Sequence, residues 1–213
     1  MSFDYLAAIN FLESTRIKLS KEKIARQMEE IIVFCDKIFP HPDWRNFLGI
    51  DYEADLLAHQ NWLNKFWEEK HPETVVRGLW FGLFNPVRNG ETVADIYINT
   101  CSEYDSEDPE CNWIYSTHLW DNVQYAHSDA LADIYRNAYH PNEGLRNAAE
   151  YSLCLSYGVF MATHLLHSFN PDLSHCQSDK LGVVVGFDSG DIIRVGELSQ
   201  SGLLLHSSDI NAG

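Results

Sequence analysis

Apolar and polar positions in the first seventy residues recur with the period of an α-helix. One apolar stripe has members three and four residues apart: Ile24, Met28, Ile31, Cys35 and Ile38. This stripe predicts a helix that Ser20 caps and Pro40 ends. A second helix is expected from Asp51 to the residue before His71, and a shorter one over residues 3–13.

The period then changes to that of β-strands. Residues 74–84 are rich in β-branched and aromatic side chains, which favours a strand. Asn89-Gly90 predicts a turn into a second strand over residues 91–99. A third strand is expected over residues 112–117, and short connections make the segment 74–117 an antiparallel meander.

Helical spacing returns after residue 120, with Ser128 as a candidate cap for a second piece. A longer helix follows, and its middle, residues 151–162, is apolar on nearly every side. That pattern predicts a helix in the core, between the sheet and other helices. Residues 181–196 predict a β-hairpin, with Asp188-Ser-Gly-Asp191 as its turn.

These elements predict an α+β protein in which helices pack an antiparallel sheet. We find no Pro/Gly/Ser-rich linker, internal repeat or low-complexity run, so residues 1–213 are expected to form a single domain. Its parts would be a helical region (1–72), the sheet with its core helices (73–198) and a tail (199–213).

Five scattered cysteines without a C-x-x-C pair favour reduced thiols. The first residues lack the basic region of a secretory signal, and no apolar run approaches the ~18 residues of a membrane span. We therefore expect a cytoplasmic protein. Cys101 and Cys111 bracket one loop, which leaves a regulatory disulfide as an alternative.

The net charge of -16 falls mostly on residues 71–213, because the first seventy residues hold nine Lys/Arg against twelve Asp/Glu. The 47 residues between Arg88 and Arg136 contain ten carboxylates but no Lys or Arg. A surface built from this segment would repel nucleic acid and anionic lipid, and it would attract a basic protein or another cation.

The densest part is the loop 101–111, whose carboxylate spacing does not match that of a calcium-binding EF-hand loop. It could be a solvated hairpin tip, a weak calcium site or a docking surface for a basic partner. Six carboxylates are the predicted partner-binding residues: Glu103, Asp105, Glu107, Asp108, Glu110 and Asp121.

Enzyme signatures are weak in this chain, and we expect no cofactor. His164 and His167 share a helix face, and His175 or Cys176 could return as a third metal ligand. The sequence lacks an H-E-x-x-H motif, and histidines also stabilise a helix C-terminus. A second alternative is proton transfer by His118 with Asp121.

The sequence therefore favours a binding protein over an enzyme. It predicts an acidic surface, roughly Asp95 to Asp133, that docks a basic protein, as a toxin-neutralising (immunity-like) or regulatory protein would. The alternative function is a small metal-dependent hydrolase that uses His164 and His167. The binding hypothesis requires that carboxylates from separate segments meet on one face.

Overall fold

A computed structural model describes residues 2–69, 75–88, 91–116, 125–140, 144–169, 173–176, 178–188 and 190–206. Its helices are α1 (Tyr5–Lys18), α2 (Ile24–Ile38), α3 (Tyr52–Glu69), α4 (Asp129–Ala138) and α5 (Asn147–His167). Short 3-10 helices are η1 (Pro42–Gly49), η2 (Asn112–Tyr115) and η3 (Leu173–Cys176). The main strands are β1 (Gly78–Phe84), β4 (Asp95–Cys101), β5 (Tyr125–His127), β6 (Lys180–Phe187), β7 (Ile192–Ser199) and β8 (Gly202–Leu205). Two short strands, β2 (Val87–Arg88) and β3 (Glu91–Thr92), pair with each other.

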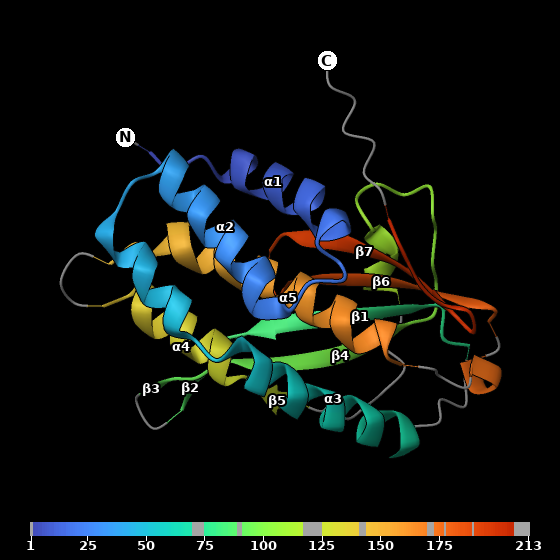
Figure 1. Ribbon diagram of the computed structural model, residues 1–213. Helices are drawn as coiled ribbons and strands as arrows, with labels where there is room; N and C mark the ends of the chain where they lie inside the picture. Colours follow the sequence, from blue (N-terminus) through green and yellow to red (C-terminus); the bar gives the residue numbers. More distant parts are fainter. Residues whose placement is uncertain are drawn as a thin grey trace.

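Six strands form one mixed sheet in the order β5-β4-β1-β6-β7-β8 (Figure 1). Neighbouring strands are antiparallel except for β1 and β6, which run parallel with Phe81 opposite Val185. The long connection between these strands contains α4 and α5, which gives it the length that a parallel crossover needs. The predicted α+β class and the hairpin are confirmed, whereas the parallel junction was not predicted.

Side chains along each strand point alternately to the two faces of the sheet. Both faces are buried, each in its own hydrophobic core. Leu79, Phe81 and Leu83 belong to the large core beneath the helices. Trp80 belongs to a smaller core on the opposite face, together with Tyr97 of β4. The helices cover the first face, and the loop after β4 covers part of the second (Figure 1).

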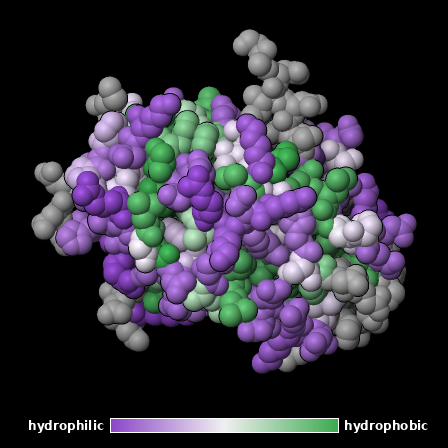
Figure 2. All heavy atoms as spheres, viewed as in Figure 1, coloured by the Kyte–Doolittle hydropathy of each residue, from purple (hydrophilic) through white to green (hydrophobic). Residues whose placement is uncertain are grey.

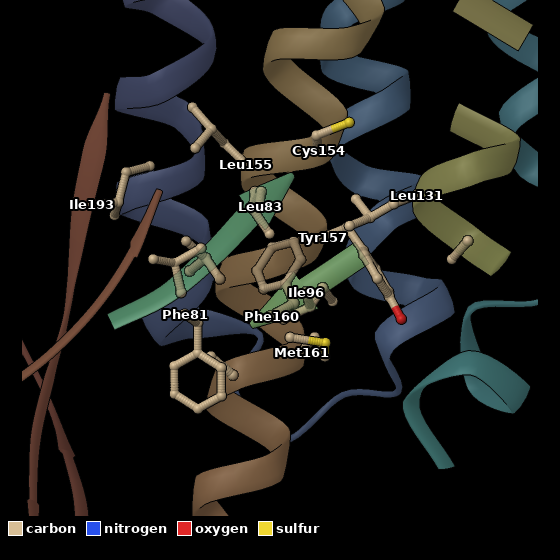
Figure 3. Packing of buried hydrophobic residues seen from close by; sticks show 14 of the residues in the cluster. Phe81, Leu83, Ile96, Leu131, Cys154, Leu155, Tyr157, Phe160, Met161 and Ile193 are labelled. Atoms are coloured by element: carbon tan, nitrogen blue, oxygen red, sulfur yellow. The ribbon is translucent and has the colours of Figure 1, made fainter. Parts of the chain in front are cut away.

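Helix α5 lies between the sheet and the other helices, as the sequence predicted. Figure 3 shows its side chains Leu155 and Phe160 among residues of β1, β4 and β7. A Cβ atom at Gly158 would lie 2.8 Å from Cγ1 of Val185, so glycine allows the helix to approach the sheet closely. Over α5, the sequence pattern and the packing agree.

The predicted third strand at 112–117 is wrong. Asn112–Tyr115 forms the 3-10 helix η2, and the strand that pairs with β4 is β5. Within this segment, the N–H of Ile114 donates to the carbonyl of Cys111 and the N–H of Ser116 donates to the carbonyl of Trp113, the three-residue spacing of a 3-10 helix. The preceding Cys111 has a φ of 54°, which turns the chain away from extended geometry.

The ends of two helices also differ from expectation. Ser20 does not cap α2, which begins at Ile24; the Ser20 hydroxyl instead donates to the carbonyl of Ile17 after α1. Ser128 caps α4 as predicted, because its Oγ accepts from the N–H of Leu131 at 3.1 Å. Helix α1 is longer than residues 3–13.

The C-terminal segment contributes to the sheet. Gly202–Leu205, within the expected tail, pairs with β7 as edge strand β8. Arg16 at the end of α1 is buried and donates to the carbonyls of Val195 at 3.0 Å and His206 at 2.8 Å. The first helix is thereby bonded to the last strands of the sheet.

Among the described helices, none combines the length and apolar character that crossing a membrane requires.

Candidate partner-binding surface

The acidic loop, residues 102–110, follows β4 on the sheet face opposite the helices (green in Figure 1). It returns into η2, whose Trp113 and Ile114 pack into the smaller core with Trp80. The loop is therefore attached at both ends to buried residues, and its charged tip projects from that base.

Arg194 of β7 fixes the backbone of the acidic loop. Its guanidinium donates to the carbonyls of Ser106 at 2.7 Å, Asp105 at 3.1 Å and Asp108 at 2.6 Å. All three acceptors are backbone oxygens. The arginine therefore orders the loop without forming an ion pair with any loop carboxylate.

Tyr104 makes the second attachment. Its ring lies over Gly182, where a Cβ atom would be only 2.2 Å from the ring, so a side chain there would clash. The Tyr104 hydroxyl donates to Glu197 Oε1 at 2.7 Å, and Lys180 Nζ contacts both oxygens of Glu197. Burial and the bond to Glu197 raise the pKa of Tyr104, so the hydroxyl remains a donor at neutral pH.

Two carboxylates shape the loop from within. Asp105 accepts from the N–H of Glu107 at 2.8 Å, and Asp108 accepts from the N–H of Glu110 at 3.0 Å. Asp108 also accepts from the backbone N–H of Asn112 at 2.5 Å. Such side-chain-to-backbone bonds stabilise turns, so these two residues order the loop as well as charge it.

Most of the five loop carboxylates face solvent. Glu103, Asp105, Glu107 and Glu110 are exposed, and Asp108 is half-buried. The ion pairs formed by described residues involve none of the five. A groove of about 560 Å³ lies beside them, lined by Glu103, Asp105 and one cation, Arg77.

Among the described residues, the larger acidic wall expected from Asp95 to Asp133 does not form as one surface. Asp95 is 1 % exposed and pairs with Arg88 and, at 3.5 Å, with His127. Asp133 pairs with Arg136 on α4. Burial and local pairing therefore remove these carboxylates from the candidate surface. Asp121 and His118 lie outside the described residues.

The histidine cluster is not assembled as a metal site in the part of the chain that the structure describes. His164 Nε2 bonds to Gln27 Oε1 at 2.9 Å, and burial lowers the pKa of both His164 and His167. The side chain of His175 is not described. No group of three His, Cys, Asp or Glu among described residues could hold a metal ion.

All five cysteines are free and buried. Cys101 and Cys111 both belong to the smaller core beneath the acidic loop. Burial raises the pKa of Cys101 to about 12 and also raises that of Cys111, which keeps both thiols protonated at neutral pH.

Sequence reasoning identified the loop carboxylates but missed the residues that hold them. Arg194, Tyr104 and Glu197 act across some ninety positions of sequence. Gly182 was the sequence signal closest to this attachment, because a glycine within a strand indicates that another group approaches the backbone closely. Comparison with family models, with curated proteins and with solved structures found no match to this chain.

Proposed function

We propose that this chain is an acidic binding protein that docks a basic protein through the acidic loop. One observation carries the proposal: the loop backbone is clamped by Arg194 while none of its five carboxylates has a cationic partner within ion-pair distance among described residues. An ordered surface of one sign speeds encounter with a partner of opposite sign and limits the entropy lost on binding.

The composition of other exposed surface is consistent with an electrostatic contact. Figure 2 shows the helical face covered mostly by hydrophilic residues, with hydrophobic residues in separate spots. Among the described residues of that face, then, no broad apolar patch competes with the acidic loop as a docking surface. A contact dominated by charge is expected to be sensitive to salt, because the Debye length is about 8 Å at physiological ionic strength.

The proposal has a toxin-neutralising version and a regulatory version. A basic toxin that cleaves nucleic acid has an anion-binding cleft, which an acidic loop could occupy in place of the substrate. We place this role in the cytoplasm, which the five free thiols support. The alternative of a metal-dependent hydrolase has no favouring observation in the described residues.

The test is affinity capture from a lysate of the source cells, at about 50 mM and about 500 mM salt. The test variant combines Glu103→Gln, Glu107→Gln and Glu110→Gln, which leaves the turn-forming Asp105 and Asp108 unchanged. We expect a basic protein to be retained at low salt in stoichiometric amount, lost at high salt, and at least tenfold depleted with this variant.

The matched control combines Glu22→Gln, Asp36→Asn and Glu68→Gln, three exposed carboxylates on the helical side. It makes the same change in net charge and should retain the partner. Equal depletion with both variants would reduce the effect to net charge and overturn the loop assignment. Inhibition of the captured protein's nuclease activity would select the toxin-neutralising version.

A further inference from the structure

A cavity of about 730 Å³ opens at the other end of the sheet from the acidic loop. It lies beyond the carboxyl ends of the parallel strands β1 and β6, next to the first turns of α1 and α5. The chain leaves β1 toward β4 and leaves β6 toward β7, in opposite directions along the sheet. Diverging connections leave a crevice between adjacent parallel strands, and ligands commonly bind there.

Aromatic rings and carboxylates share the walls of this cavity. Tyr5, Tyr135 and Tyr151 are among its rings, and its acidic groups are Glu150, Asp188 and Asp191. Leu83, Phe84 and Phe187 add apolar surface between them. The volume is in the range of small-molecule sites, roughly 300–1,000 Å³.

Each carboxylate is held by a tyrosine hydroxyl. Tyr97 donates to Asp188 Oδ1 at 2.5 Å, and Tyr139 donates to Glu150 Oε2. Tyr151 is hydrogen-bonded to Asp191, and burial together with this bond raises the pKa of Tyr151 to about 12. A neutral donor orients a carboxylate without cancelling its charge.

No lysine or arginine is among the described residues that line the cavity. None of the three carboxylates takes part in an ion pair of the described residues. Arg146, before α5, opposes the raised pKa of Tyr139, whose hydroxyl donates to Glu150. Three negative charges therefore face one cavity with aromatic walls.

This combination of walls selects the chemistry of the ligand. Carboxylates bind ammonium groups by charge-assisted hydrogen bonds, and tyrosine faces attract the same cations. Apolar surface between the charges suits methylene chains. A compact metal ion fits less well, because each carboxylate is bound to its own tyrosine and no metal-holding group exists among described residues. We propose that this cavity binds a small aliphatic polyamine, independently of the partner docked by the acidic loop.

The probe is spermidine, titrated into the full chain by calorimetry at constant ionic strength. We expect saturable binding of one molecule, and no binding of the uncharged chain 1,8-octanediol. Glu150→Gln combined with Asp191→Asn should weaken binding about tenfold. The matched control, Glu103→Gln with Glu107→Gln in the acidic loop, should change affinity less than about twofold.

Tyr5→Leu provides a second readout that leaves every carboxylate in place. Tyr5 is 39 % exposed, so its loss is tolerated by the fold, and removal of its ring should weaken spermidine binding about threefold. Thermal melts establish folding of each variant, and the Tyr5 variant decides the question if the double amide variant does not fold.

Four outcomes would overturn the proposal: no saturable binding, equal weakening in the cavity and loop variants, an unchanged affinity in the Tyr5 variant, or displacement of spermidine by Mg²⁺ at matched ionic strength. Binding of N-acetyl-lysine amide as tightly as spermidine would instead assign the cavity to a lysine side chain of a protein. Because the cavity and the acidic loop lie at opposite ends of the sheet, absence of spermidine binding leaves the proposed function untouched.

Discussion

Asp55 is a buried carboxylate that joins three helices. It is 5 % exposed on α3, and its oxygens accept from Ser128 Oγ at 2.8 Å, from the N–H of Asp129 at 2.8 Å and from the hydroxyl of Tyr157 on α5. The carboxylate thus satisfies donors at the start of α4 and in the centre of the core. Removing it would leave those donors buried without an acceptor.

We predict that Asp55→Ala destabilises the fold by about 3 kcal/mol, because unsatisfied buried donors retain their full desolvation cost. Urea denaturation measures the change. The neighbouring Asp129→Asn serves as a control, since its side chain is 90 % exposed and its loss should cost no more than about 1 kcal/mol. Equal effects of the two substitutions would show that the Asp55 bonds contribute little.

Gly158 gives a second prediction at the scale of one residue. Gly158→Ala raises helix propensity by about 1 kcal/mol, yet its methyl group would press on Val185 and Leu83. We expect net destabilisation of about 1–2 kcal/mol. Adding Val185→Ala makes room for the methyl group, so the double variant should be more stable than the sum of the single changes. Simple additivity in urea denaturation would contradict the steric explanation.

At the scale of elements, the sequence specified helices and strands where one period ran for several turns or residues. The apolar stripe of α2 and the apolar middle of α5 were sufficient to predict these helices, because the spacing of apolar residues shows which sides of a helix are buried. The prediction for Asn112–Tyr115 was wrong because the pattern of only four residues is compatible with both a strand and a 3-10 helix.

The attachment of the acidic loop also belongs to this scale, and it predicts a pH dependence. Partial burial raises the pKa of Glu197, but the Tyr104 hydroxyl and the Lys180 ammonium outweigh that effect, and the pKa is lowered. A lowered pKa in the folded state means that the charged form stabilises the fold above the unfolded pKa of about 4.3. That stability is lost as the pH falls through the folded value.

We therefore expect Glu197→Gln to cost about 0.5–1 kcal/mol at pH 7 and progressively less below about pH 4. Urea denaturation of both proteins between pH 3 and pH 7 tests this. Glu103→Gln is the control, because Glu103 is exposed and forms no described ion pair, and its stability difference should stay small throughout. A Glu197 difference that grows on acidification would reverse the sign of the argument.

At the scale of the molecule, the arrangement of charged groups was harder to predict from the sequence than the arrangement of hydrophobic residues. The carboxylate-rich segment was evident. Its division into a buried Asp95 paired with an exposed arginine, a helix-surface pair at Asp133 and the acidic loop without ion pairs among described residues was not. Pairing depends on which cation the fold brings near, and Arg88 reaches Asp95 because the paired strands β2 and β3 turn the chain back between these two residues. The sequence thus identified the acidic loop, but not that Asp95 and Asp133 lie outside the candidate surface.

The expectation of a single domain depends on contacts between the helical region and the sheet. One continuous core includes Leu12 of α1, Ile98 of β4 and Val195 of β7, and Arg16 bonds the first helix to the last strands. Helix α5 packs against the sheet and against the other four helices. Separation of the helical region from the sheet would therefore expose apolar surface on both. Both should therefore unfold together.

We predict one cooperative urea transition, coincident by far-UV circular dichroism and tryptophan fluorescence. Leu12→Ala in the helical region and Ile98→Ala in the sheet should each cost about 2–5 kcal/mol, since both residues are fully or nearly fully buried. Each should shift the whole transition for both probes by the same amount. A variant that displaced only one probe, or a biphasic curve in the wild type, would divide the chain into two independently stable units.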